Sequence, residues 1–577
     1  MKNRKLIRKA LIIAGLFLCL LIKIKAEKIG AEINWTNYEA ENTKTNGVVL
    51  GPKYDPFLVE TESSGQKCVK LEGPGKFIEF KVSKKANAAV IRYSLPDSDD
   101  GKGTGLSLAI YKNGKLIKTV AISSRYSRLY GYYPFSNDPK EGRPRNYYDE
   151  VRLKDFEVKE GDILKIRCEI KPGDNASYCI IDLIDLELIP EPIKVPENSL
   201  SINDKEFTGE DFKGDYTEAF QKCIGKAWES GKVVWIPAGT FKISGNIFVP
   251  SNVKIMGAGM WHSVLEGDEE LYEEPGNRVR IIGNGSNIQL ADFAIVGKLN
   301  YRKDDEWNDG IVGSFGENSG ISRLWIEHTK IGVWVENSRN LVVEGCRFRN
   351  LIADGINFCV GMTESTMRNC TARGTGDDCF AMWPATFLFQ KYTPGKNVIE
   401  NCTGQLPFLA NGAAIYGGES NKIINCSFTD ISPGSAILIS TTFPTEDKKV
   451  NNNFTGTTVI ENCEIKTSGG YDHTWEWRAA IQICLDKRNI SGLAIRNVNI
   501  LNSFSDGISI IGRSYKNNIP QLSDAIFENV NVSGYGLGSK GKYGLWIDQG
   551  AQGKIALLNS NIVEKKNESS GFALTMQ

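Results

Sequence analysis

The chain has 577 residues, which is too long for one compact core and predicts two or more domains. It carries 69 Lys and Arg against 69 Asp and Glu, so its net charge is zero. This balance provides no overall positive field for nucleic acid or for a strongly acidic polysaccharide, and a neutral or small substrate fits better.

The N-terminus has the pattern of an export signal. Residues 1–10 contain five Lys or Arg, and the apolar run "ALIIAGLFLCLLI" that follows has 13 residues. Such a run is short for a membrane span and suits the core of a signal peptide. We therefore expect residues 1–26 to be a signal peptide, and the mature protein to be secreted, periplasmic or on the cell surface without stable membrane insertion. A retained membrane anchor is the alternative.

Residues 27–190 alternate apolar and polar positions between frequent turns, as in "GLSLAIYKNGKLIKTVAI". This pattern predicts an antiparallel β-sandwich. Residues 188–199 contain three prolines, and we expect a linker at 191–199.

The segments "YEAEN" and "CIIDLIDLELIP" of this domain resemble carbohydrate-binding modules of families 6 and 35. In those modules early acids and a late Asp hold a structural calcium. The resemblance implies Glu39, Glu41 and Asp185 as calcium ligands here, since calcium takes oxygen ligands. The alternative is that they are ordinary strand acids.

Residues 200–577 repeat two short patterns. One includes "DGIVG" (309–313), "DGINF" (354–358) and "DCFAM" (378–382), and the other includes "TMRNCTA" and "VIENCTG". Short β-branched segments that recur every 20 to 50 residues between Gly, Asn and Asp are typical of a solenoid of strands. We predict an all-β chain with a right-handed parallel β-helix after the β-sandwich. An amphipathic helix at 215–231, with Phe220, Ile224 and Trp228 facing the core, should cap the first coil.

Two columns of side chains accompany the repeats. We expect the first to form an internal hydrogen-bond ladder at a turn; its members are Asn369, Asn401, Asn425, Asn462, Asn497, Asn529 and Asn559. We expect the second to be buried free thiols that pack as small apolar groups; its members are Cys346, Cys370, Cys402, Cys426 and Cys463.

The stretch "GTGDDCFAMW" places two carboxylates side by side, Asp377 and Asp378. Asp354 has the same repeat phase as Asp378, and neighbouring coils are about 4.8 Å apart, so we expect all three acids in one patch. Repulsion should raise the pKa of one acid so that it keeps a proton at neutral pH while the others are ionised. Acid–base hydrolysis needs this separation of pKa values between a general acid and a general base. Adjacent aspartates can share a face only at a corner, which Gly374 and Gly376 permit. A diagonal step between coils could give the roughly 6.5–9.5 Å of an inverting glycosidase.

The sandwich, "IPAGTF" (236–241), "ADGIN" (353–357) and "GTGDDCFAMW" together resemble glycoside hydrolase family 87, the α-1,3-glucanases and mycodextranases. The resemblance implies a secreted, endo-acting, inverting hydrolase of α-1,3-glucan that needs no cofactor for catalysis. Carried over, it makes Asp354, Asp377 and Asp378 the catalytic residues. Asp377 would be the general acid, and the other two would hold the attacking water. The Gly-His-Gly and Arg-Ile-Lys segments of polygalacturonases are absent.

Further substrate contacts are expected from repeat phase and from the aromatic insertion "YDHTWEW"; they are Asp309, His328, Trp383, Tyr416, Trp475 and Trp477. For each, a structural role is the alternative. Two other readings of the whole chain remain: a hydrolase of nigeran or dextran, and a non-catalytic β-helix polysaccharide-binding protein. The expected partner is an α-glucan, and a monomer is expected.

Overall fold

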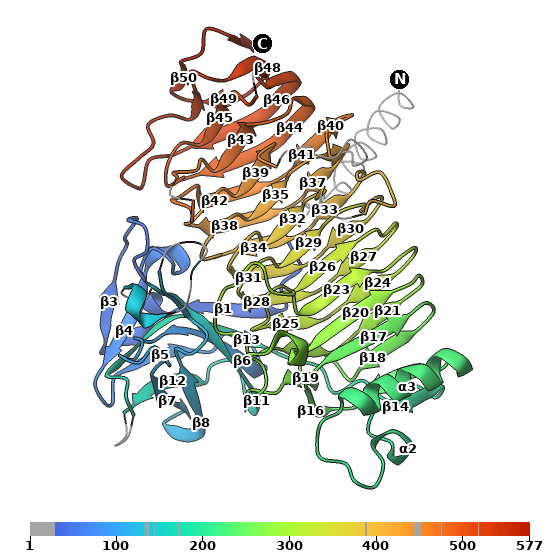
Figure 1. Ribbon diagram of the computed structural model, residues 1–577. Helices are drawn as coiled ribbons and strands as arrows, with labels where there is room; N and C mark the ends of the chain where they lie inside the picture. Colours follow the sequence, from blue (N-terminus) through green and yellow to red (C-terminus); the bar gives the residue numbers. More distant parts are fainter. Residues whose placement is uncertain are drawn as a thin grey trace, which may run out of the picture.

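The computed structural model describes residues 29–577, apart from 132, 134, 136–137, 143–144, 171–173, 387–388, 444–451, 475 and 517. The signal peptide expected at residues 1–26 lies outside the described part of the chain. As predicted, the chain is almost entirely β-structure: an N-terminal sandwich lies beside a long stack of parallel strands (Figure 1).

The sandwich consists of two antiparallel sheets whose apolar faces pack together. In β12, Leu164, Ile166 and Cys168 face the core and are buried, and the residues between them are more exposed. The first sheet contains β1 (Trp35–Glu39), β3 (Val48–Leu50), β4 (Cys68–Glu72), β6 (Ala86–Ser94), β11 (Asp149–Val158) and β13 (Tyr178–Glu187). The second contains β2 (Lys44–Thr45), β5 (Phe77–Lys81), β7 (Gly105–Lys112), β8 (Lys115–Ser123) and β12 (Ile163–Glu169). A separate ribbon pairs β9 (Arg128–Leu129) with β10 (Arg145–Asn146).

The second part of the chain is a parallel β-helix, in which successive coils add strands to two long sheets. A 24-stranded sheet runs from β14 (Ser199–Ser201) to β51 (Phe572–Met576). A 12-stranded sheet contains β17 (Asn246–Pro250), β20 (Arg280–Asn284), β23 (Gly310–Ser314), β26 (Val333–Glu336), β29 (Ile356–Phe358), β32 (Phe380–Met382), β35 (Ala413–Ile415), β39 (Ile437–Ser440), β43 (Ile481–Leu485), β45 (Ile508–Gly512), β47 (Leu545–Ile547) and β50 (Lys565–Asn567). The first repeat pattern of the sequence falls on this 12-stranded sheet.

Two helices, α2 (Lys205–Thr208) and α3 (Thr217–Ser230), lie at the N-terminal end of the β-helix (Figure 1). As predicted, α3 covers the first strands, packing against β14 and β17. It buries Phe220, Cys223, Ile224 and Ala227, which form one stripe at helical spacing. Trp228 was expected on this stripe, but it lies beside it and is 59% exposed.

The cysteine column is confirmed as buried free thiols. Cys346, Cys370 and Cys402, for example, each place Sγ within hydrogen-bond reach of a backbone carbonyl on the preceding coil.

The expectation of an internal asparagine ladder is wrong. The column lies at a surface turn, where its members are half-buried or exposed. All have φ between +47° and +54°, the left-handed region that Asn tolerates better than most residues. Hydrogen bonds of 3.1 Å join Asn462, Asn497 and Asn529 along this surface.

Buried ion pairs join the sandwich to three strands of the 24-stranded sheet, β25 (Trp325–Glu327), β28 (Arg347–Leu351) and β31 (Thr371–Thr375). Arg347 donates two hydrogen bonds, of 2.6 and 2.7 Å, to Glu187 at the end of β13. Arg373 pairs with Glu150 and with Asp185, the latter at 2.8 Å. Because buried charges are costly to separate, these pairs fix the sandwich against the β-helix.

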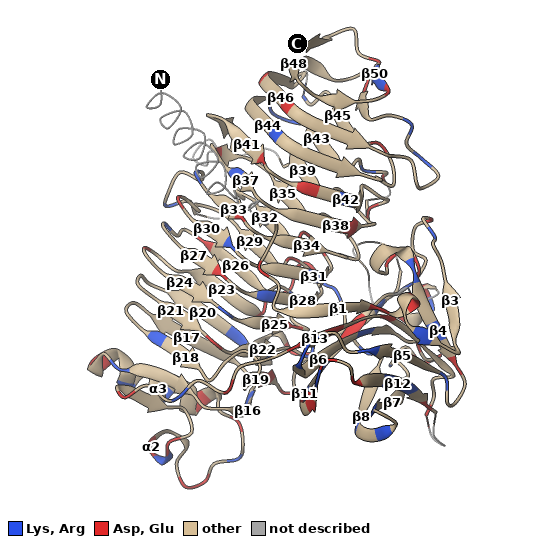
Figure 2. Ribbon diagram, turned by 180° about the vertical axis from the view of Figure 1, so that it is seen from behind, with Lys and Arg blue, Asp and Glu red and all other residues tan. Residues whose placement is uncertain are grey.

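Acidic and basic residues are interspersed along both parts of the chain (Figure 2), in keeping with its zero net charge. Within the described residues, the search for membrane spans finds no helix with the length and apolarity to cross a bilayer.

Candidate active site

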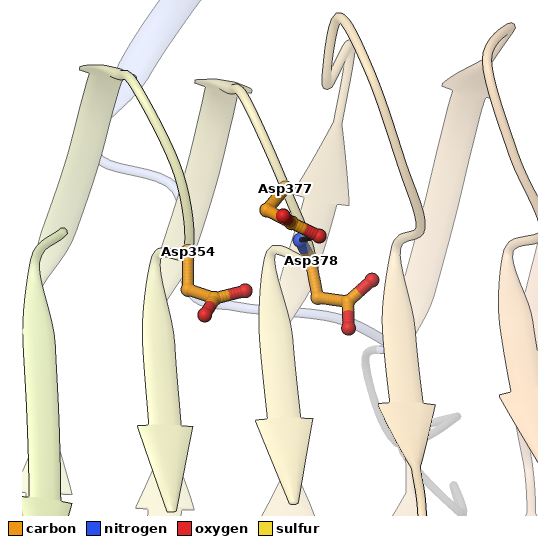
Figure 3. Close-up of side chains that lie close together, drawn as sticks. All are labelled: Asp354, Asp377 and Asp378. Carbon is orange, nitrogen blue, oxygen red and sulfur yellow. Dashed lines mark hydrogen bonds between the residues drawn. The ribbon is translucent and has the colours of Figure 1, made fainter. Parts of the chain in front are cut away.

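The register of the 12-stranded sheet brings the three predicted catalytic acids together. Ile356 of β29 pairs with Phe380 of β32, so Asp354 and Asp378, each two residues earlier, are neighbours on adjacent coils. Asp377 joins them from the same corner (Figure 3). One oxygen from each carboxylate lies within 4.8 Å of the other two.

The chain between β31 and β32 makes the corner that this arrangement requires. Gly374 has φ of +72°, a backbone conformation that residues other than glycine rarely adopt. Gly376 lies against the preceding coil: a Cβ atom there would stand 2.0 Å from the carbonyl oxygen of Ile352 and 2.7 Å from the ring of Phe408. Both glycines therefore allow Asp377 and Asp378 to face the same patch.

The change Gly376→Ala should displace this corner and lower kcat about 100-fold, because a misplacement of about 1 Å at catalytic groups costs that much. Steady-state kinetics on an α-1,3-glucan oligosaccharide would measure the loss. Gly225→Ala in α3 is the matched control, since an added Cβ there meets nothing within 4 Å. Equal kcat for the two variants would contradict the role given to the corner.

Asp354 lies at the floor of the site and is buried. Burial, reinforced by repulsion from Asp377 and Asp378, raises the pKa of Asp354 well above its usual range. Asn357 donates a hydrogen bond of 3.0 Å to its Oδ2. Asp354 therefore holds its proton more tightly than an ordinary aspartic acid does.

Asp378 is also buried, between two donors on the next coil. The backbone and side-chain amides of Asn411 donate to Oδ1 at 3.2 and 2.8 Å, and the Tyr416 hydroxyl donates to Oδ2 at 3.0 Å. Burial and repulsion from Asp377 raise the pKa of Asp378 to about 7 despite these hydrogen bonds. Both floor residues thus have the raised pKa that crowding of the three acids predicts, and retention of a proton stays a prediction.

Asp377 differs from the other two because 25% of its side chain is exposed. Its Oδ2 accepts a hydrogen bond of 2.7 Å from Nη2 of Arg302. Lys330 lines the same cleft, and burial lowers the pKa of Lys330 to about 8. The trio is the one group of three acids in the described residues that is close enough to hold a metal ion, but Arg302 already supplies positive charge to it.

The pKa of Asp354 has a consequence for stability. A carboxyl of the unfolded chain loses its proton near pH 3.9, whereas folded Asp354 keeps it to a much higher pH. Raising the pH above about 4 therefore favours unfolding, by up to about 1.4 kcal/mol per pH unit. In Asp354→Asn this cost is absent. The urea midpoint of Asp354→Asn should rise relative to that of the wild type between pH 4 and pH 7. A constant difference between the two midpoints would show that Asp354 ionises normally.

The trio forms part of the floor of a cleft of about 850 Å³. Its lining residues lie on or beside eight adjacent strands, from Asn246 at β17 to Phe443 beyond β39. At about 4.8 Å per strand, this length is roughly 34 Å. Aromatic rings line it, including Trp307, which is 66% exposed, and Trp334.

The structure brings two of the six expected substrate-contact residues to this cleft, Trp383 and Tyr416. Asp309 is not among the lining residues: it is buried, and its carboxylate accepts hydrogen bonds from the Tyr272 hydroxyl at 2.6 Å and the Lys330 amide at 2.7 Å. His328 lies instead at the junction with the sandwich, where its Nε2 is 2.8 Å from Oδ1 of Asp149. Both side chains are thus taken up by structural partners, and His328 is not on the face of the cleft where it was expected.

The aromatic insertion does not bring Trp477 to the cleft. Trp475 lies outside the described residues, and Trp477 packs against Tyr471, with ring centroids 5.5 Å apart. The same insertion places His473 against Tyr133, with ring centroids 4.7 Å apart.

The three acids expected to bind calcium do not form a group of ligands in the structure. Asp185 accepts hydrogen bonds from Arg373 at 2.8 Å and Asn37 at 3.1 Å, and the arginine would repel a cation there. Glu39 accepts a hydrogen bond from Ser64 at 3.0 Å, and burial raises the pKa of Glu39 to about 8. Asp185 therefore does not fit a calcium site, whereas a structural calcium at Glu39 and Glu41 stays a prediction.

Several site residues were not found from the sequence. Asn411 could have been, because it has the register of Asp378 on the next coil. Arg302, Trp307 and Lys330 lie on or beside loops that do not repeat, and Tyr133 belongs to the sandwich; none of these positions carries a sequence signal.

Comparison with known proteins identifies the family. The model of alpha-1,3-glucanase catalytic domain D1 matches residues 32–189, and that of domain D2 matches 218–560, more than half of the chain. The crystal structure of the Agl-KA catalytic domain has a TM-score of 0.83 at 26% identity, over 95% of this chain and 99% of that one. The catalytic unit of a thermostable GH87 alpha-1,3-glucanase from Streptomyces thermodiastaticus strain HF3-3 has a TM-score of 0.77 at 27% identity, over 95% and 96%. A GH87 alpha-1,3-glucanase catalytic domain in complex with nigerose shares the fold, with a TM-score of 0.78 at 24% identity over 95% and 98%.

Curated proteins match over a shorter segment. The preneck appendage protein of Bacillus phage PZA is 26% identical over 204 residues, which is 33% of this chain and 23% of that protein. The pre-neck appendage protein of Bacillus phage B103 is 27% identical over 225 residues, 38% of this chain and 22% of that protein. The chain thus spans less than a quarter of the length of these relatives. Both parts of the chain match the family models, and the chain belongs to the alpha-1,3-glucanases of glycoside hydrolase family 87.

Proposed function

We propose that the protein is an exported, monomeric, endo-acting hydrolase that cleaves α-1,3-glucosidic bonds of α-glucan with inversion at the anomeric carbon. The observation that carries this proposal is the trio of aspartates in an aromatic-lined cleft. The basic and apolar pattern at residues 1–26 supports export.

The geometry supports different roles for the three acids. Asp377 is the most exposed of them, so it is the carboxyl that best reaches the glycosidic oxygen of a chain lying in the cleft. We assign it as general acid. Asp354 and Asp378 lie deeper, and together they hold and deprotonate the attacking water. Burial and mutual repulsion raise the pKa of the floor pair, and one oxygen of each acid lies within 4.8 Å of the other two, so a proton held there can be exchanged within the trio.

Inversion requires that water, and not a carboxylate, attack the anomeric carbon. Inverting enzymes with two carboxylates usually hold them about 6.5–9.5 Å apart. The closest oxygens of this trio are nearer than that sequence-based expectation, within 4.8 Å. With three acids, however, a water can lie against two of them while the third faces the leaving oxygen, provided that the water attacks the anomeric carbon from the side opposite that oxygen.

The cleft supports a neutral polysaccharide as substrate. Aromatic rings such as Trp307, Trp334 and Trp383 offer flat apolar faces for glucose rings, and the roughly 34 Å length admits several units, as internal cleavage needs. A solved relative that shares the fold was crystallised with nigerose. Family membership and the nigerose bound to that relative support the α-1,3 linkage that we propose.

The test is the release of reducing ends from α-1,3-glucan, nigeran and dextran by the purified protein. We expect release mainly from α-1,3-glucan, with a broad range of early products, as internal cleavage gives. Preferential release from dextran or nigeran would overturn the linkage. Binding without release from any of the three would favour a binding protein.

A further inference from the structure

We propose that Arg302 is a positioning residue for Asp377, and that the N-terminal sandwich holds Arg302 in place through Tyr133. This inference deepens the hydrolase function proposed above and rests on it. It makes the sandwich a working part of the active site.

Arg302 holds both the side chain and the backbone of the catalytic corner. Its Nη2 donates to Oδ2 of Asp377 at 2.7 Å, and its Nη1 donates to the carbonyl of Gly376 at 2.7 Å. Nη1 also reaches the carbonyl of Ile352, at 3.2 Å, on the coil that carries Asp354. With only 3% of its side chain exposed, Arg302 has little freedom to leave this arrangement.

Arg302 comes from the loop between β22 (Ala294–Val296) and β23, and it is itself oriented by Asp304. Its Nε donates to Oδ1 of Asp304 at 2.9 Å. The other carboxylate oxygen of Asp304 accepts a hydrogen bond of 2.9 Å from the hydroxyl of Tyr133. The guanidinium also lies 5.6 Å from the ring centroid of Tyr133, within the range of a cation–π contact.

Tyr133 lies between β9 and β10, so the chain of contacts begins in the sandwich. His473 packs against its ring, with centroids 4.7 Å apart. The sandwich supports the corner by a second route. Tyr147 stacks on Phe408, with ring centroids 3.9 Å apart, and the ring of Phe408 lies against Gly376. Two aromatic residues of the sandwich therefore reach the corner that carries Asp377.

The charge around Arg302 explains why a neutral side chain would not replace it. Asp377 and Asp304 attract it, and this attraction outweighs burial, raising the pKa of Arg302 above its usual value. Nζ of Lys330 donates a hydrogen bond of 3.0 Å to the backbone carbonyl of Asp304. Asp354 and Asp378 repel Asp377 from the floor of the cleft. Without Arg302, the three acids would lose the cation that contacts Asp377 directly.

The test compares kcat, KM and the pH profile on an α-1,3-glucan oligosaccharide. Arg302→Gln should lower kcat about 100-fold with little change in KM, and should move the pH profile about one unit to higher pH, because carboxyls that lose a nearby cation bind protons more tightly. Arg302→Lys should recover part of kcat and return the profile towards the wild type. Tyr133→Phe keeps the ring and loses one hydrogen bond, so it should lower kcat by roughly 3- to 10-fold.

Two matched controls separate positioning from general damage. Tyr130→Phe removes another tyrosine–aspartate hydrogen bond of the sandwich, to Asp97, and Arg323→Gln removes a different, two-bond arginine–carboxylate pair, with Asp292 of the β-helix. Both should keep the wild-type pH profile and kcat at a temperature where they are folded. Wild-type behaviour of Arg302→Gln and Tyr133→Phe, or equal effects in the controls, would overturn the inference while leaving the hydrolase function standing. An inactive wild-type protein would overturn both.

Discussion

The change Asp377→Asn should reduce kcat on α-1,3-glucan by on the order of 10²–10⁴-fold, because the amide cannot give a proton to the leaving oxygen. Its volume is nearly that of the acid, so the corner and the contact with Arg302 should persist in altered form. Initial rates of reducing-end release measure this loss. Little change in rate would remove Asp377 from catalysis.

A substrate whose leaving group needs no proton separates the acid from the base. On an α-nigerosyl fluoride, Asp377→Asn should retain much of the wild-type rate, because fluoride departs without protonation. Asp354→Asn and Asp378→Asn should stay slow on the same substrate, since both impair activation of the water. If Asp354→Asn alone is rescued by the fluoride, Asp354 is the general acid and the roles must be exchanged.

The change Arg373→Met should destabilise the folded protein by about 3–5 kcal/mol, because it leaves buried carboxylates without their cation. Arg373 is almost fully buried between Glu150 and Asp185 of the sandwich. It also belongs to β31, directly before the catalytic corner. Activity should therefore fall together with stability. Urea unfolding followed by tryptophan fluorescence, together with kcat, measures both.

The control is Arg323→Met, which breaks a two-bond pair with Asp292 at 2.6 and 2.7 Å. More than half of the Arg323 side chain is exposed, so this pair should contribute only about 0–1 kcal/mol. Adding Glu150→Gln to Arg373→Met should recover part of the loss, because one buried charge disappears. Equal midpoints for Arg373→Met and Arg323→Met would mean that the interface pairs contribute little to stability.

The sequence was sufficient to predict the β-helix and the meeting of its three aspartates because a parallel β-helix repeats its geometry. Once Asp354 and Asp378 have the same repeat phase, the register of β29 and β32 makes them neighbours. Gly374 and Gly376 indicated the corner that adds Asp377, because their local backbone and close approach admit no side chain.

Repeat phase does not determine what a side chain binds. Asp309 has the phase of the trio, yet Tyr272 and Lys330 take up its carboxylate. His328 lies beside the same coils, yet it pairs with Asp149 of the sandwich. Such pairings depend on loops and on the other domain, whose positions no repeat specifies.

The largest part of the site that the sequence did not reveal comes from outside the coils. Arg302 and Tyr133 meet only because the sandwich packs beside the β-helix and the loop after β22 lines the cleft. Tyr133 stands 171 residues from Asp304 in the chain. A contact of this kind between two domains leaves no recognisable motif in the sequence.

The most direct test of the account is proton NMR of the first product released from an α-1,3-glucan oligosaccharide by the purified protein. The account predicts that the new reducing end appears as the β-anomer and equilibrates only later by mutarotation. Early appearance of the α-anomer would show retention and make one of the aspartates a nucleophile. Absence of any product would contradict the hydrolase function itself.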